Sequence, residues 1–213
     1  MEYRAFFNSN RELWQQLKDG NIQAMGELFN RNHSYLVAYG LKITPSREIV
    51  FDSIQDVFLS IWNSRENLGD ICNVVSYLFK ALRNELLRRM RQEARFSPLT
   101  ESKVTDGIDM NFSYEDIILQ KETSREIHQF LLQALNKLGS RQKEAIYLKF
   151  YFGMSNSEIA EVMDLQDQSV RNTIHEALKL LKQIITVSIS WVFSLFLPVQ
   201  FVPSFLLYVE INY

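Results

Sequence analysis

The sequence is poor in residues that make tight turns and cross-links. Its 213 residues include 7 glycines, 4 prolines and 1 cysteine, Cys72. So few turn residues argue against a many-stranded sandwich or barrel and favour helices. A single cysteine excludes an internal disulfide and a multi-cysteine metal site, which is typical of a protein in a reducing cytoplasm.

The chain also lacks the residue spacings of common enzyme sites. Its three histidines, His33, His128 and His175, are far apart, and neither an HExxH motif nor a glycine-rich phosphate loop is present. The first residues carry charges of both signs without an apolar core, so we expect no secretory signal. These absences predict a protein of the cytoplasm with no catalytic residue, no metal and no cofactor.

What is present divides the chain into four segments. The hydrophobic content of 46% is enough for a buried core, and residues 186–213 carry only one charged residue, Glu210. Residues 96–124 hold 6 acidic residues against 2 basic ones and lack helical spacing. We therefore predict an all-α protein with a helical domain over 1–95, a loosely packed acidic linker over 96–124, a second helical domain over 125–185 and a hydrophobic tail over 186–213.

Residues 50–62 show the clearest helical pattern in the first domain. Apolar residues recur there at the spacing of one helix face and predict a buried stripe, Ile54, Val57, Phe58 and Ile61. The opposite face carries two carboxylates around one leucine, and such a patch suits a basic partner helix. Solvated surface is the alternative. This acidic patch consists of Asp52, Gln55, Asp56 and Leu59.

Residues 74–95 predict a long helix with a basic face. Its stripe of Leu78, Leu82 and Leu86 should be buried, while aromatic and cationic residues share the rest of the surface. Cations along a phosphate backbone beside rings that stack on unpaired bases are typical of single-strand binding. Cations that offset a helix dipole are the alternative. The candidates are Tyr77, Phe79, Lys80, Arg83, Asn84, Arg88 and Arg91.

Residues 141–182 carry the most specific pattern. Ser155 with Glu158 predicts a capping box at the start of a short helix, and Asp164 suits the left-handed turn after it. A second helix then follows, so the segment predicts a helix-turn-helix whose second helix enters the DNA major groove. An αα-hairpin with a polar outer face is the alternative. The residues expected to face the bases are Gln168, Ser169, Arg171, Asn172 and His175.

Taken in this order, the three patterns resemble the sigma-70 family of RNA polymerase initiation factors, in its small extracytoplasmic-function (ECF) type. Residues 50–62 match the family pattern D-x-x-Q-[ED]-V-F-L-x-x-W in region 2, residues 77–91 are similar to later parts of region 2, and residues 138–177 are similar to region 4. The turn glycine of the family is Asp164 here, and Arg88 stands where the family has a carboxylate.

The resemblance implies a division of labour. The acidic patch would bind core RNA polymerase, the basic helix with the loop 63–73 would melt and capture the minus-ten element of promoter DNA, and the helix from Gln168 would read the minus-thirty-five element. The resemblance also makes a membrane-bound anti-sigma factor a plausible partner.

Two other functions stay open from the residues alone. A stand-alone helix-turn-helix regulator would bind duplex DNA without polymerase, and it leaves the acidic patch unexplained. A membrane-tethered interaction protein would use residues 184–209, which carry no charge and would span about 40 Å as one helix, against about 30 Å of hydrocarbon. Pro198 and Pro203 interrupt that stretch, so its packing against protein is the competing expectation.

Overall fold

The computed structural model describes residues 2–71, 73–96, 108, 110–113 and 125–195. Within these ranges the regular elements are all helical, which confirms the predicted fold class. The elements are α1 (Glu2–Lys18), α2 (Ile22–Ile43), α3 (Arg47–Asn63), the 3-10 turn η1 (Arg65–Asn67), α4 (Val74–Phe96), α5 (Arg125–Asn136), α6 (Ser140–Ile146), the π-helical turn η3 (Tyr147–Tyr151), α7 (Asn156–Met163) and α8 (Asp167–Leu195).

Helices α1 to α4 form one unit, the N-terminal bundle. Its breaks lie where the sequence places them: α2 ends before Pro45, and the side chain of Ser46 caps α3 by accepting a hydrogen bond from the backbone N–H of Ile49. The apolar stripes predicted on 50–62 and 74–95 both face the core of this bundle. Their buried members are Ile54, Val57, Phe58, Ile61, Leu78, Leu82 and Leu86.

Gly40 marks a close approach of α2 to α3. A methyl group at Gly40 would lie 2.7 Å from Cγ1 of the buried Val50, whereas one at Gly26 on the same helix would meet nothing within 4 Å. We expect Gly40→Ala to destabilise the protein by about 1–3 kcal/mol through overpacking. Gly26→Ala should stabilise it by about 0.5–1 kcal/mol through helix propensity. Urea unfolding of both variants checks this, and a Gly40→Ala midpoint above wild type would contradict the close packing.

Helices α5 to α8, with η3, form the C-terminal bundle. The predicted capping box is confirmed: Ser155 Oγ accepts from the N–H of Glu158, and Glu158 Oε2 accepts from the N–H of Ser155 at 2.6 Å. Asp164 adopts the left-handed conformation, with φ of 56°, so the turn to α8 has the expected geometry. Helix α8 continues to Leu195, so the boundary predicted between the second domain and the tail at residue 185 falls inside a helix.

Part of the acidic linker is packed more tightly than predicted. Ile108, Met110 and Phe112 are all buried, and Asn136 of α5 exchanges two hydrogen bonds with the backbone of Phe112. These three apolar residues occupy every second position, which is not the spacing of a helix face. A search for helical spacing overlooks that alternation, and the prediction of a loose linker is wrong for these residues.

Among the described residues, no helix combines the length and the apolar composition that crossing a membrane requires. The membrane contact predicted over 184–209 falls partly outside the described residues, which end at 195.

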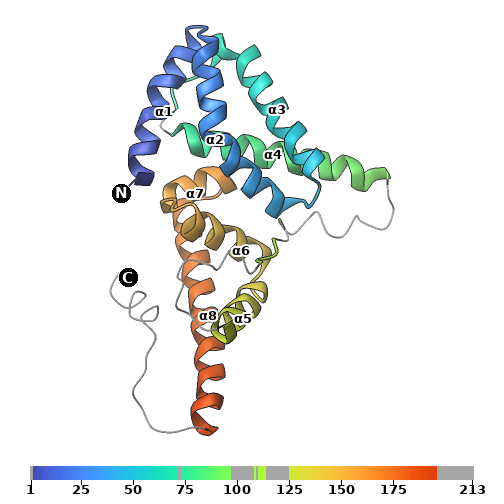
Figure 1. The fold of residues 1–213 in the computed structure, drawn as a ribbon, viewed down its shortest axis with the longest axis vertical. Helices are drawn as coiled ribbons and strands as arrows, with labels where there is room; N and C mark the ends of the chain where they lie inside the picture. Colours follow the sequence, from blue (N-terminus) through green and yellow to red (C-terminus); the bar gives the residue numbers. More distant parts are fainter. Residues whose placement is uncertain (1, 72, 97–107, 109, 114–124, 196–213) are drawn as a thin grey trace.

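The two bundles are in direct contact. Helix α7 packs on α4, and Figure 1 shows α7 next to the lower side of the N-terminal bundle while α8 runs away from it. The contact joins residues that are far apart in the chain: Arg83 and Glu144 are 61 positions apart, and Tyr39 and Glu144 are 105 apart. The basic face of α4 therefore lies partly at an interface between bundles.

Candidate functional site

The acidic patch lies on the outer face of α3, as its spacing predicts. All four members are exposed, and the side chain of Leu59 is 55% exposed between the polar groups. Arg89 of α4 lies beside the patch: its guanidinium donates to Asp56, and Nη1 lies 4.0 Å from Asp52. Sequence reasoning did not find Arg89, because nothing in a single sequence pairs positions 33 apart on two helices.

Arg89 also connects the two aspartates of the patch to a third carboxylate. Its Nε donates to Glu85 at 2.7 Å, and the hydrogen bond to Glu85, against some burial, holds the pKa of Arg89 above its usual value. Arg88 donates twice to Glu85 and lowers the pKa of that carboxyl. Three carboxylates therefore share two guanidinium groups, which leaves the cluster with one net negative charge at its exposed edge.

The predicted single-strand surface on α4 divides into an open part and a covered part. Asn84, Arg88 and Arg91 are exposed. Tyr77 is half-buried, with its ring edge-on to Trp14 at 5.3 Å between centroids. The remaining members turn toward the C-terminal bundle and are Phe79, Lys80 and Arg83.

Arg83 is held by a buried carboxylate of α6. Its Nε donates to Glu144 Oε1 at 2.7 Å and Nη2 donates to Oε2 at 3.2 Å, while the Tyr39 hydroxyl donates to the same Oε1 at 2.7 Å. The side chain of Glu144 is 0% exposed and that of Arg83 is 13% exposed. Burial and the nearby Glu144 raise the pKa of Tyr39 well above its ordinary value, so the phenol stays protonated and can donate.

Two more polar contacts bring the helix-turn-helix against α4. Lys80 Nζ donates to Asp164 Oδ1 at 2.9 Å, and this hydrogen bond lowers the pKa of the Asp164 carboxyl. Asn73, just before α4, donates to Glu158 of the capping box at 2.5 Å. The sequence predicted local roles for Glu158 and Asp164 and showed no signal for these distant partners.

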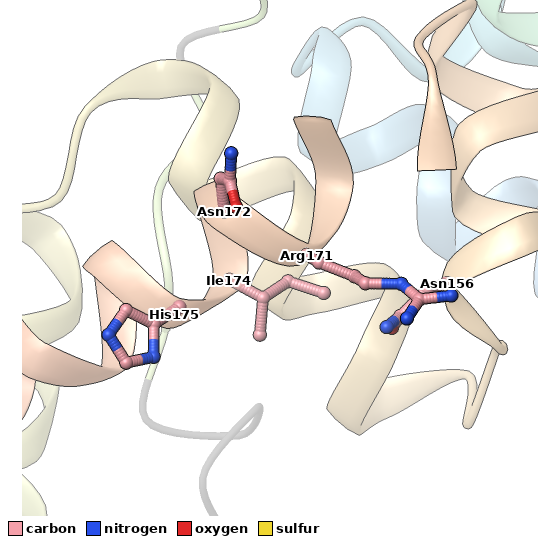
Figure 2. Close-up of a pocket in the computed structure, with 5 residues that line it drawn as sticks. All are labelled: Asn156, Arg171, Asn172, Ile174 and His175. Carbon is pink, nitrogen blue, oxygen red and sulfur yellow. The ribbon is translucent and has the colours of Figure 1, made fainter. Parts of the chain in front are cut away.

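The predicted base-reading residues lie together at the exposed start of α8. All five are exposed, Arg171 Nε donates to Asp167 at 2.8 Å, and Gln168 Nε2 donates to Asn172 at 3.0 Å. Figure 2 shows Arg171 extending toward Asn156, the first residue of α7. Arg171, Asn172 and His175 line a cavity of about 340 Å³ together with Ile174 and Asn156.

These surfaces suit binding more than metal chemistry. Within the part of the chain that the structure describes, no group of three or more His, Cys, Asp or Glu side chains could hold a metal ion. The arrangement instead offers a carboxylate patch on α3, cations on α4 and a set of hydrogen-bonding side chains at the start of α8. Each is a candidate recognition surface.

Two family models match the chain, one over each bundle. Residues 28–96 match sigma-70 region 2, which includes the acidic patch and the basic face of α4. Residues 129–181 match sigma-70 region 4, which includes the helix-turn-helix.

Curated proteins similar to the chain are bacterial sigma factors. The ECF RNA polymerase sigma factor SigL of Mycobacterium tuberculosis is 23% identical over 160 residues, which are 74% of this chain and 86% of that protein. The RNA polymerase sigma factor CnrH of Cupriavidus metallidurans is 25% identical over 178 residues, 80% of this chain and 91% of that protein.

Solved structures with the same fold come from the same group. CnrH in complex with the cytosolic domain of CnrY gives a TM-score of 0.54 at 23% identity, covering 84% of this chain and 97% of that one. The sigma factor RpoE in complex with the anti-sigma factor NepR, from Bartonella quintana, gives 0.53 at 21% identity, covering 76% and 96%.

Proposed function

Because the chain belongs to the sigma-70 family, as a sigma factor of the ECF type, we propose that its two bundles divide promoter recognition between them. The N-terminal bundle binds core RNA polymerase and the minus-ten element, and the C-terminal bundle binds the minus-thirty-five element. One observation carries the proposal. The match to region 2 covers the candidate surfaces of the N-terminal bundle, and the match to region 4 covers the candidate surface of the C-terminal bundle. Its site of action is the cytoplasm, where polymerase and promoter meet.

The acidic patch is the proposed contact for polymerase. Asp52 and Asp56 are exposed on a helix face whose other side is core, so they contribute little to folding and are available to a partner. Leu59 adds an apolar contact at the centre of the charged group. A basic helix of the polymerase fits this combination of charge and apolar area.

Helix α4 is the proposed contact for melted DNA. Cations at successive turns can follow the phosphates of one strand, and the aromatic residues of the same helix can stack on unpaired bases. Asn84, Arg88 and Arg91 are already exposed for this role. Tyr77, Phe79, Lys80 and Arg83 complete the surface.

The start of α8 is the proposed contact for duplex DNA. A left-handed turn at Asp164 sets α8 across α7, and the five predicted residues project from the first three turns of α8. Residues at the start of a recognition helix are those that reach base edges in the major groove.

Run-off transcription with core polymerase tests the proposal. Addition of the full chain should start transcription at defined promoters, and the chain without polymerase should bind duplex promoter DNA weakly. Tight, sequence-specific duplex binding without polymerase, combined with no effect on initiation, would instead identify a stand-alone helix-turn-helix regulator.

Arg171→Ala should reduce discrimination within the minus-thirty-five element. A guanidinium that contacts a guanine edge contributes about 1–3 kcal/mol of preference for the correct base, and alanine cannot supply it. Competition between promoters that differ at single positions of the element measures this loss. Lys179→Ala is the matched control, because it removes one exposed cation two turns further along α8. A uniform loss for all sequences, equal to that of the control, would show that Arg171 contacts only phosphate.

An anti-sigma factor is a further proposed partner. The sigma factor RpoE of Bartonella quintana, whose fold this chain shares, forms a complex with the anti-sigma factor NepR. Co-purification of this chain with a candidate partner, followed by loss of run-off activity, would test the assignment.

A further inference from the structure

Polar contacts between the bundles converge on the residues that the proposed function assigns to melted DNA. Arg83 is bound by Glu144, and Lys80 is bound by Asp164. Tyr39 donates to Glu144 from α2, so the buried carboxylate receives hydrogen bonds from two helices of the other bundle. We call Tyr39, Lys80, Arg83, Glu144 and Asp164 the interbundle latch.

An aromatic contact closes the same interface. Phe152, which follows η3, lies edge-on to Phe79 with 4.9 Å between ring centroids, and Tyr39 packs on Phe79 at 5.0 Å. Phe79 is 0% exposed and Phe152 is 1% exposed. In this arrangement Phe79 has no open ring face for a base.

We propose that the C-terminal bundle is an intramolecular inhibitor of minus-ten binding, in which Glu144 and Asp164 hold Arg83 and Lys80 in place of DNA phosphates. The inference rests on the proposed function and adds its regulation. The free chain is closed, and it captures a single strand only after the bundles separate.

In the closed chain Glu144 occupies Arg83, and in the open chain a DNA phosphate can take its place. A carboxylate and a phosphate both offer paired oxygens to one guanidinium, so Arg83 can bind Glu144 or the DNA backbone and not both. Glu144 is buried, and separation of the bundles returns its charge to water. Attachment of the N-terminal bundle to polymerase, or capture of α8 by duplex DNA, can supply the free energy that separates them.

Glu144→Gln is the first test, because it preserves the shape of the side chain and removes the charge that pairs with Arg83. We expect the variant to bind a fluorescein-labelled, mixed-sequence DNA single strand about tenfold more tightly than wild type by anisotropy. Its radius of gyration in small-angle X-ray scattering should increase. Glu27→Gln, on the exposed face of α2, is the control, since it removes the same charge away from the interface.

Tyr39→Phe is the second test and acts from the other bundle. It deletes only the hydroxyl that donates to Glu144, and it leaves the C-terminal bundle unaltered, so it decides the matter if Glu144→Gln does not fold. We expect a smaller change of the same sign in both measurements, about threefold in affinity. Circular dichroism verifies that each variant keeps its helices.

The outcomes separate the latch from the proposed function. Wild-type affinity and wild-type radius of gyration in Tyr39→Phe and in every folded Glu144 variant would overturn the latch, while run-off transcription by the wild type would still support the function. Open, expanded variants in a chain that never starts transcription would support the latch and overturn the function. The scattering measurement makes this distinction because it uses neither polymerase nor DNA.

Discussion

The double replacement Asp52→Lys and Asp56→Lys is expected to weaken binding to core RNA polymerase about 100-fold or more. Opposed like charges across an interface cost several kcal/mol, and about 2.7 kcal/mol corresponds to 100-fold. Both carboxylates are exposed and neither belongs to the core, so the effect should appear in binding while the helix content stays the same. Titration of labelled protein with core polymerase measures the affinity.

Arg89 makes this prediction sharper. It lies beside both aspartates, and the new lysines would repel it, which should lower the free energy of unfolding by about 1 kcal/mol at most for exposed charges. The control is Glu12→Lys with Glu27→Lys, which makes the same change of net charge on exposed positions of α1 and α2. Normal binding by the Asp52 and Asp56 variant, or an equal loss in the control, would show that the patch is not the polymerase contact.

The double replacement Arg83→Ala and Arg91→Ala is expected to reduce open-complex formation about 100-fold. Each charge-assisted hydrogen bond contributes about 1.5–3 kcal/mol, and the salt dependence of binding should fall by about one unit of slope for each lost phosphate contact. Permanganate footprinting of the melted strand over a range of salt concentrations measures both quantities. Arg11→Ala with Arg47→Ala, two exposed cations away from α4, is the matched control.

Arg83→Ala alone distinguishes the two roles of this arginine. Removing it leaves the Glu144 carboxylate buried without its cation, so the closed arrangement is destabilised as it is in Glu144→Gln. The two variants should therefore expand alike in scattering and differ in DNA binding, which is weaker for Arg83→Ala and tighter for Glu144→Gln. Tighter strand binding by Arg83→Ala would show that this arginine serves only the latch.

The parts of the fold that the sequence predicted are those fixed by neighbours in the chain. The buried stripe of α3, the capping box of Ser155 and Glu158 and the left-handed turn at Asp164 each depend on residues a few positions apart. The exposed start of α8 follows from the same local pattern, because its buried residues Val170 and Ile174 fix which side faces outward.

The parts that could not be predicted depend on distant pairs. Nothing near Arg83 in the sequence indicates that Glu144 will cover it, and a buried glutamate in α6 is indistinguishable from a surface one by spacing alone. The burial of Ile108 and Met110 could not be predicted for another reason, since these apolar residues alternate with polar ones in an acidic stretch without helical spacing. In both cases, packing against residues distant in the chain buries side chains whose sequence neighbours are typical of an exposed surface.

Helix α8 runs without a break from the proposed base-reading residues at its start to Leu195. Its 29 residues, Asp167–Leu195, correspond to a rod of about 43 Å. A continuous helix transmits a tilt from one end to the other, because bending it requires strained or broken backbone hydrogen bonds. A partner that binds α8 near Leu195 can therefore change the orientation of the proposed recognition residues at the start of the helix. A tilt of the helix would change the angle at which Arg171 and Asn172 enter the DNA major groove, while their hydrogen bonds within α8 are preserved.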